Sequence, residues 1–427
     1  MKTDCPDWLE LVSCGQRCRP ISKQYPGIAT FRKAVEEEMI RHDFDEIIDR
    51  RGTDSEKWND YPPDVLPMWV ADSDFKCPAP VIDALHERVR HGVFGYCWDD
   101  LMKVEKAAAH WMRTRFDWEV SPEWVVFSPG VGSVLSAAVN AFTMPGDYVV
   151  IMTPVYPPFS MAPVFNGRIP LNASLRIGGN GYEIDFAGLE TLLAKPRTKL
   201  LLLCNPHNPT GKLLTREELL RVGELCLKNR VVVLSDEVHC DYVFDGKKHI
   251  PFASLSPEIA DISLVAINPS KTFNLADMRT AGVISSSKFL REQYRTAVTN
   301  VKLGRSSLGL LAFETAYMTC AYYVDQLVPY IKGNLDYAVA SVNGNIPGIS
   351  VRMPEATYLL WLDCRELELS QRQLVNFFLQ EAKVALNSGE SFGQEGVGFM
   401  RLNTACPRAT LHDGLSRIEQ ACRARIR

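Results

Sequence analysis

One lysine in this chain follows an apolar segment in a setting that suits covalent chemistry. Lys271 comes four residues after the run Ser-Leu-Val-Ala-Ile at 263–267, within the sequence Asn-Pro-Ser-Lys-Thr-Phe-Asn. Its amine can form an imine with an aldehyde and, when free, can move a proton at the α-carbon of a substrate. A lone lysine after a strand is usually a solvated surface residue, so this interpretation depends on the residues that accompany it.

Two polar residues upstream follow apolar segments in the same way. Asp236 closes the run that begins at Val231, and a carboxylate there can pair with the nitrogen of a pyridine ring and keep it protonated. Asn208, within Asn-Pro-His-Asn-Pro-Thr-Gly, could donate a hydrogen bond to an oxygen on such a ring. Alternatively, Asp236 could cap a helix, and the segment around Asn208 could be a plain turn.

A phosphate group would need backbone amides and a cation. The segment Ser-Pro-Gly-Val-Gly-Ser, which includes Val131 and Gly132, leads from a strand into a helix and offers amides at the helix N-terminus. Leu135 stands where a dinucleotide fingerprint has its third glycine, so a single phosphate fits better than a pyrophosphate. Arg279, eight residues after Lys271, would supply a fork of donors to the same group, unless it is a surface arginine.

Two further residues could complete such a site. Tyr156 follows the apolar run at 148–152 and could stack on a cofactor ring, or pack in the core. Arg401 is a cation within an apolar segment, where it needs either a substrate carboxylate or an internal acid. The four main groups are the amine of Lys271, the carboxylate of Asp236, the amide of Asn208 and the guanidinium of Arg279. Each stands at the end of its own strand or turn, and together they provide what pyridoxal phosphate (PLP) requires.

Other reactive patterns are weaker. Gly389–Gly393 matches the GxSxG motif of serine hydrolases, but a glycine-rich stretch follows it instead of a helix. Cys14 and Cys18 have no second pair of zinc ligands nearby. The dipeptide His239-Cys240 supplies too few ligands for a metal. No metal site is predicted.

The composition narrows the class of protein. The chain has 427 residues, which suggests two domains, and a net charge of −4, which gives no general attraction to nucleic acid or to an anionic membrane. No apolar run is long enough to cross a membrane, and the first residues do not resemble a secretion signal. The cysteines lie mostly within apolar runs, which indicates reduced thiols in a cytoplasmic protein.

Apolar strands alternate with amphipathic helices over the middle of the chain. This pattern predicts an α/β fold with a mostly parallel sheet covered on both faces, and catalytic groups at the carboxyl ends of its strands. After about residue 320 the pattern changes to that of a smaller α+β domain. The predicted divisions are an N-terminal extension (1–40), an N-terminal segment packing with the small domain (41–80), a large cofactor-binding domain (81–320) and a small C-terminal domain (321–427).

As a set, these motifs resemble the fold-type I PLP enzymes. The similarity is greatest to the MalY/PatB-like cystathionine β-lyase (C–S lyase) subgroup of the class I/II aminotransferase family, and it runs from about Phe44 to Cys422. The segments that carry it are Phe44–Gly52 (FDEIIDRRG), Trp69–Phe75 (WVADSDF), Gly92–Tyr96 (GVFGY), Cys204–Gly211 (CNPHNPTG), Ser235–His239 (SDEVH), Ser270–Asn274 (SKTFN) and Met400–Arg408 (MRLNTACPR).

The resemblance implies an aminotransferase-like fold with a mixed, mostly parallel seven-stranded sheet. It also implies a homodimer in which a tyrosine reaches the phosphate of the neighbouring subunit. The implied roles are Lys271 as Schiff-base lysine, Asp236 on the ring nitrogen, Asn208 on the ring oxygen and beside the substrate, Tyr156 as stacking ring, Arg401 as clamp of the substrate carboxylate, Tyr96 as the tyrosine from the neighbour, and Val131, Gly132, Ser270 and Arg279 as further cofactor-binding residues.

Three positions depart from the usual pattern of this subgroup. Asp277 replaces a glycine six residues after the lysine, Asn268 replaces a small residue or serine, and Ser73 replaces a methionine. An additional acid at position 277 could reshape the phosphate side or the substrate side of the site.

The expected function is PLP-dependent β-elimination from L-cystathionine, L-cysteine or cysteine S-conjugates, giving pyruvate, ammonia and a thiol. An aminotransferase and a racemase or epimerase would share the same residues and remain alternatives. A PLP-binding regulatory protein on the same scaffold is a non-enzymatic alternative. The residues do not specify which amino acid is the substrate.

Overall fold

The computed structural model describes residues 41–97, 101–179, 181–301 and 304–426. Asp43–Arg427 form one compact unit. The expected N-terminal extension, residues 1–40, lies outside the described residues.

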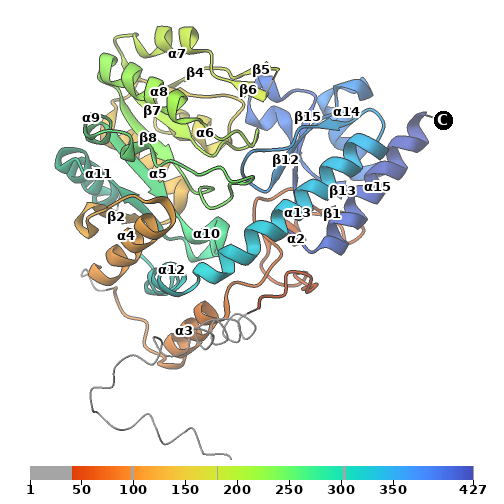
Figure 1. Ribbon diagram of the computed structural model, residues 1–427, viewed down its shortest axis with the longest axis horizontal. Helices are drawn as coiled ribbons and strands as arrows, with labels where there is room; N and C mark the ends of the chain where they lie inside the picture. Colours follow the sequence, from red (N-terminus) through yellow and green to blue (C-terminus); the bar gives the residue numbers. More distant parts are fainter. Residues whose placement is uncertain (1–40, 98–100, 180, 302–303, 427) are drawn as a thin grey trace, which may run out of the picture. The chain divides into compact units, whose positions relative to one another are not determined.

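A seven-stranded sheet forms the centre of this unit (Figure 1). β10 is antiparallel to both of its neighbours, and the other pairs are parallel. The mixed, mostly parallel seven-stranded sheet is thereby confirmed. In spatial order the strands are β2 (Val125–Ser128), β10 (Ala281–Ile284), β9 (Ser263–Ile267), β8 (Val232–Asp236), β7 (Thr198–Cys204), β3 (Tyr148–Ile151) and β4 (Ile169–Asn172).

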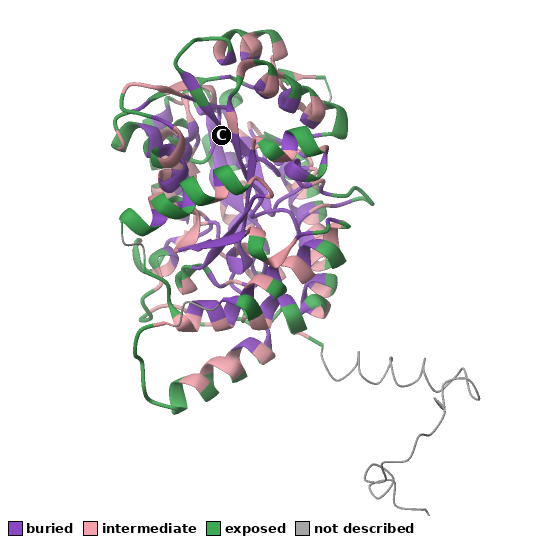
Figure 2. Ribbon diagram, turned by 90° about the vertical axis from the view of Figure 1, so that its left-hand side faces the viewer, coloured by how far each residue is buried: buried purple, intermediate pink, exposed green. Residues whose placement is uncertain are grey.

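Helices cover both faces of this sheet, because its central strands carry buried apolar side chains on both faces. One face packs against α5 (Gly130–Phe142), α6 (Pro158–Phe165) and α11 (Lys288–Asn300). The other face packs against α7 (Phe186–Leu193), α8 (Arg216–Asn229) and α9 (Pro257–Asp261). Figure 2 shows buried strands between helices whose outer sides are exposed.

The start of α8 illustrates how local sequence sets an element. Thr215 accepts a hydrogen bond from the amide of Glu218 at 3.2 Å, and the Glu218 carboxylate accepts one from the amide of Thr215 at 2.9 Å. This reciprocal cap satisfies amides that the first helical turn leaves free.

A second, antiparallel sheet lies in the C-terminal part of the chain. Its order is β11 (Ser350–Val351), β12 (Leu359–Asp363), β15 (Phe399–Asn403) and β14 (Asn387–Ser388). The helices of this region are α13 (Ala321–Asn345), α14 (Gln371–Asn376) and α15 (Arg408–Ile426).

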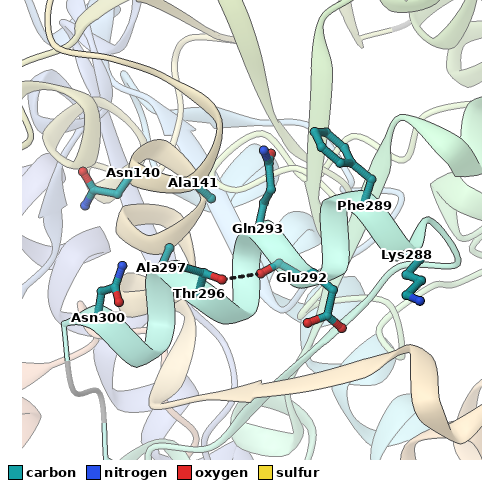
Figure 3. A pocket seen from close by; sticks show the side chains of 9 residues that line it. All are labelled: Asn140, Ala141, Lys288, Phe289, Glu292, Gln293, Thr296, Ala297 and Asn300. Atoms are coloured by element: carbon teal, nitrogen blue, oxygen red, sulfur yellow. Dashed lines mark hydrogen bonds between the residues drawn. The ribbon is translucent and has the colours of Figure 1, made fainter.

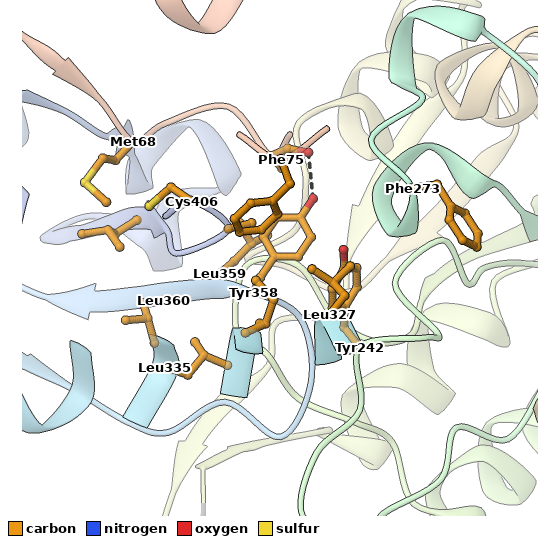
Figure 4. Close-up of a cluster of buried hydrophobic side chains, with 14 of the residues drawn as sticks. Met68, Phe75, Tyr242, Phe273, Leu327, Leu335, Tyr358, Leu359, Leu360 and Cys406 are labelled. Carbon is orange, nitrogen blue, oxygen red and sulfur yellow. Dashed lines mark hydrogen bonds between the residues drawn. The ribbon is translucent and has the colours of Figure 1, made fainter. Parts of the chain in front are cut away.

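The segment before the large sheet joins this C-terminal region. β1 (Leu66–Pro67) pairs in parallel with β13 (Val384–Ala385). Residues that are distant in sequence, among them Met68, Phe75, Leu335 and Tyr358, also share one buried cluster (Figure 4). This is the contact that the predicted grouping of residues 41–80 with the small domain requires, although the domain boundaries stay a prediction.

Among the described residues, no helix combines the length and apolar character needed to cross a membrane. Nor does this part of the chain bring together three or more histidine, cysteine or acidic side chains in a way that could hold a metal ion.

Candidate cofactor and substrate site

Three predicted residues lie at or just after the ends of three adjacent parallel strands. Asp236 is the last residue of β8, Asn208 comes four residues after β7, and Lys271 comes four residues after β9. Because parallel strands present their carboxyl ends at one edge of the sheet, these side chains meet there. The charge of Lys271 acts on Asp236, and the charge of Arg401 acts on Lys271.

Lys271 lies in the short helix α10 (Pro269–Thr272), which begins at a side-chain cap. The side-chain oxygen of Asn268 accepts a hydrogen bond from the amide of Ser270 at 2.8 Å. A serine hydroxyl can cap a helix in the same way, so the departure at position 268 preserves the local structure. Ser270 is buried beside the lysine.

The amine of Lys271 is held by the backbone of a distant segment. Its Nζ donates to the carbonyl oxygen of Ala71 at 2.8 Å, and the hydroxyl of Tyr358 donates to the same oxygen at 2.9 Å. Burial lowers the pKa of the Lys271 amine, although the negative charge of Asp72 opposes this effect. A lowered pKa increases the neutral fraction of the amine, which is the form that attacks an aldehyde or accepts a proton.

Buried ion pairs fix the segment that contains Ala71. Arg50 bonds to Asp72 at 2.8 Å and to Asp74 at 2.7 Å. Lys57, which is almost completely buried, bonds to Asp74 at 2.7 Å. These ion pairs therefore hold the backbone just after Ala71. The serine at position 73 contributes its carbonyl, which accepts from Arg50 at 3.1 Å, so this contact does not depend on the side chain.

Asp236 is a buried carboxylate with few partners. Its Oδ1 accepts a hydrogen bond from the amide of Val238 at 3.2 Å. Burial raises the pKa of Asp236 to about 7, against the opposing effects of the Val238 amide and of Lys271. A cation placed beside this group would favour its ionised form. The protonated nitrogen of a pyridine ring is such a cation.

The turn after β8 is held by a second buried acid, which the sequence reasoning missed. Glu237 accepts hydrogen bonds from the Ser235 hydroxyl at 2.8 Å and from the Phe252 amide at 2.9 Å. Its other oxygen bonds to Nε2 of His249 at 2.7 Å. These bonds fix the backbone next to Asp236. The signal in the sequence was a second acid directly after the strand.

Arg401 is buried on β15 without an acidic partner among the described residues. Its Nη1 donates to Oδ1 of Asn208 at 3.0 Å, and its Nη2 donates to the carbonyl of Trp69 at 2.8 Å and to Oδ1 of Asn387 at 2.6 Å. Its Nε has no partner. Burial lowers the pKa of the guanidinium to about 10, which leaves it charged at neutral pH. The sequence left two possible partners for Arg401, a substrate carboxylate and an internal acid. No acid among the described residues forms an ion pair with it.

Asn208 and Tyr156 adjoin the arginine. Because Oδ1 of Asn208 accepts from Arg401, the amide NH₂ group of Asn208 remains as a donor. The backbone amide of Tyr156 donates to the carbonyl of Asn208 at 3.1 Å. The Tyr156 side chain is 37% exposed, so it is not the core residue that the sequence left as an alternative.

The predicted phosphate residues also lie together. α5 begins at Gly130, which has a left-handed φ of 71°, and no side chain caps its first amides. A β-carbon placed on Gly130 would lie 4.0 Å from the α-carbon of Arg279, while the space beside Gly132 is open. Arg279 therefore adjoins the start of α5, next to the amides of Val131 and Gly132.

Tyr96 lines a hollow with Phe127 and Arg305, and none of the other predicted phosphate residues lines this hollow. The Tyr96 side chain is fully exposed, and the side chains of Val93 and Phe94 are each more than half exposed. A single chain does not bring this tyrosine to a phosphate site.

A hollow of about 730 Å³ lies elsewhere, between the end of α5 and α11 (Figure 3). It is lined by residues such as Asn140, Phe289 and Glu292. None of the residues predicted to bind cofactor or substrate lines it, and Asn140 lies at the opposite end of α5 from Gly132.

The described residues fit PLP at three points and its substrate at a fourth. Lys271 offers an amine of lowered pKa, and Asp236 offers a buried carboxylate that forms no ion pair with a described residue. The start of α5 offers uncapped amides, and the backbone of Arg279 adjoins it. Arg401 offers a buried charge whose Nε is unpaired, at a position where a substrate carboxylate could bind.

Comparisons with known proteins agree with this geometry. A family model described as aminotransferase class I and II matches residues 65–418. Cystathionine beta-lyase PatB of Bacillus subtilis (strain 168) is 44% identical over 384 residues, which cover 88% of this chain and 99% of that protein. Protein MalY of Escherichia coli (strain K12) is 36% identical and covers 90% of this chain and 99% of its own length. The crystal structure of cystalysin from Treponema denticola, which contains pyridoxal 5'-phosphate, has a TM-score of 0.86 at 32% identity, covering 90% and 99% of the two chains.

The fold and these comparisons thus identify an enzyme with the fold of the class I and II aminotransferases. The chain belongs to the aminotransferase class I and II family. The resemblance that the sequence motifs indicated is confirmed.

Proposed function

We propose that this protein is a PLP-dependent carbon–sulfur β-lyase. Its proposed substrates are L-cystathionine, L-cysteine or cysteine S-conjugates. The observation that carries the proposal is the meeting of Lys271, Asp236 and a buried Arg401 without an acidic partner among the described residues. The choice of a lyase is supported by PatB, which is named a cystathionine beta-lyase and aligns over 88% of this chain.

When bound, PLP would supply an electron sink for the bond electrons released at the α-carbon of an amino acid. Lys271 would hold the cofactor and then move the proton at this carbon. Asp236 would keep the ring nitrogen protonated, and the NH₂ group of Asn208 would donate to the ring oxygen. Arg401 would bind the substrate carboxylate and so orient the bond from the α-carbon to hydrogen.

The overall reaction consumes one water molecule. The α-carbon loses its proton to Lys271, the β-carbon loses a thiolate with the electrons of the carbon–sulfur bond, and the thiolate takes up a proton. Hydrolysis of the remaining unsaturated amine gives pyruvate and ammonia. From L-cystathionine, the thiol product is homocysteine.

The test is release of pyruvate from L-cystathionine by the purified protein loaded with PLP, without any added 2-keto acid. We expect pyruvate and homocysteine in equal amounts. Products that form only when a 2-keto acid is added would instead identify an aminotransferase. Formation of D-amino acids would identify a racemase, and no turnover of any amino acid would favour a PLP-binding regulatory protein.

We propose further that the active form is a homodimer with shared sites. The support is Tyr96, whose exposed side chain sits beside the exposed Val93 and Phe94. In a symmetric dimer the same patch of each chain would meet the other, and Tyr96 would reach the phosphate bound by its neighbour.

Mixed dimers test this arrangement. Lys271→Ala removes the amine from one chain, and Tyr96→Ala removes the phosphate contact from the other. A dimer with one chain of each kind contains one site with both groups. At a PLP concentration that leaves Tyr96→Ala mostly without cofactor, a refolded mixture is expected to exceed the summed activities of the two variants. A mixture with only the summed activity argues against sharing.

We also propose that the enzyme works in the cytoplasm. The cysteines of the described residues are free thiols, and most of them are buried. The source cells can be fractionated to test this. Recovery of the protein outside the cytoplasmic fraction would contradict the assignment.

A further inference from the structure

Arg279 has an acidic neighbour within its own turn. The short helix η5 (Ala276–Met278) ends at Arg279, whose left-handed φ of 46° closes the turn. Nε of Arg279 lies 3.9 Å from Oδ1 of Asp277, and the two side chains are 77% and 99% exposed. Among the described residues, no other acid forms an ion pair with this guanidinium.

The turn is held against the proposed phosphate site from two sides. On one side, the α-carbon of Arg279 lies next to Gly130 at the start of α5. On the other side, α12 (Ser307–Thr319) packs so closely that a β-carbon on Gly309 would lie 2.2 Å from the carbonyl oxygen of Met278. Asp277 and Arg279 share this turn, and their charged groups lie 3.9 Å apart.

The carboxylate opposes a bound phosphate in two ways. It offsets part of the positive charge of Arg279, and it repels the negative charge of the phosphate. Both effects are reduced by solvent, because the pair is exposed. Both act on the phosphate group and leave the pyridine ring at Asp236 unaffected.

We propose that Asp277 is an internal counter-ion of Arg279 that weakens the grip of this protein on the phosphate of PLP. The inference rests on the proposed cofactor site. The consequence is a cofactor that exchanges more readily than it would with an uncharged residue at position 277.

The test measures binding and needs no turnover. The cofactor-free protein and its Asp277→Asn variant are titrated with PLP, and the change in absorbance gives the Kd. We expect the variant to bind PLP about threefold to fivefold more tightly, the size of effect that a weak exposed ion pair produces. The difference is expected to shrink as the salt concentration rises.

Two controls identify the group on which the carboxylate acts. Pyridoxal, which lacks the phosphate, is expected to bind both proteins equally. Asp261→Asn makes the same charge change at the end of α9, just before the amino end of β9 and so at the opposite edge of the sheet. It is expected to leave the Kd for PLP unchanged.

An unchanged Kd for PLP in Asp277→Asn would overturn the inference, as would an equal gain for pyridoxal. If neither protein bound PLP at all, both the inference and the proposed cofactor site would be wrong. Normal PLP binding without release of pyruvate from cystathionine would contradict only the proposed lyase activity, so the two failures are distinguishable.

Discussion

Replacement of Lys271 by alanine is expected to lower kcat for pyruvate release from L-cystathionine by at least about a thousandfold. The variant loses both the covalent attachment of the cofactor and the group that moves the α-proton. The amine is positioned for these roles by its 2.8 Å hydrogen bond to Ala71 and by a pKa that burial lowers. Pyruvate can be followed with a coupled dehydrogenase assay.

The matched control is Lys228→Ala. Lys228 is an exposed lysine on α8 that pairs with Glu190 at 2.7 Å and contacts none of the predicted site residues. Its replacement is expected to leave kcat unchanged. If Lys271→Ala retained the activity of the unmodified protein while folding normally, the assignment of the reactive amine would be wrong.

The substitution Asp236→Asn is expected to lower kcat by about a hundredfold or more, as for loss of one partner of a buried charge pair. The amide has nearly the same shape but cannot stabilise a protonated ring nitrogen. Spectroscopic titration should show that PLP still binds. A variant with full activity would exclude Asp236 from this role.

Asp236→Asn lowers activity, but it is expected to stabilise the folded, cofactor-free protein. The pKa of Asp236 is raised from 3.8 to about 7, so between these values the folded protein holds a proton that the unfolded chain releases. Stability therefore falls as the pH rises through this range. Asparagine does not ionise, so the variant is expected to match the unmodified protein near pH 4 and to exceed it above pH 7, by at most about 4 kcal/mol. Urea unfolding at several pH values measures the gap, and a gap independent of pH would contradict the assigned cause.

The order of residues along the chain was sufficient to predict the sheet and the edge where the site lies. Fully apolar runs marked β7, β8 and β9 as buried parallel strands, and parallel strands end at one edge. Asn208, Asp236 and Lys271 each follow one of these runs, so their meeting could be expected before any contact was known.

The rest of the site depends on contacts that sequence patterns do not encode. The partners of Arg401 come from Trp69, Asn208 and Asn387, three segments that only the folded chain brings together. Spacing alone could not decide between an internal acid and a substrate carboxylate. Tyr96 illustrates a different limit, because its predicted role requires a second chain.

Two of the contacts at the site are made by main-chain oxygens, and this affects how genetic experiments should be interpreted. The carbonyl of Trp69 receives the Arg401 guanidinium, and the carbonyl of Ala71 receives the Lys271 amine. Ordinary amino-acid replacement leaves a peptide oxygen in place, so an alanine scan would register position 69 as a packing residue and would pass over position 71. Only an exchange of the peptide link for an ester, or a proline that bends the chain, would reveal what these two atoms do.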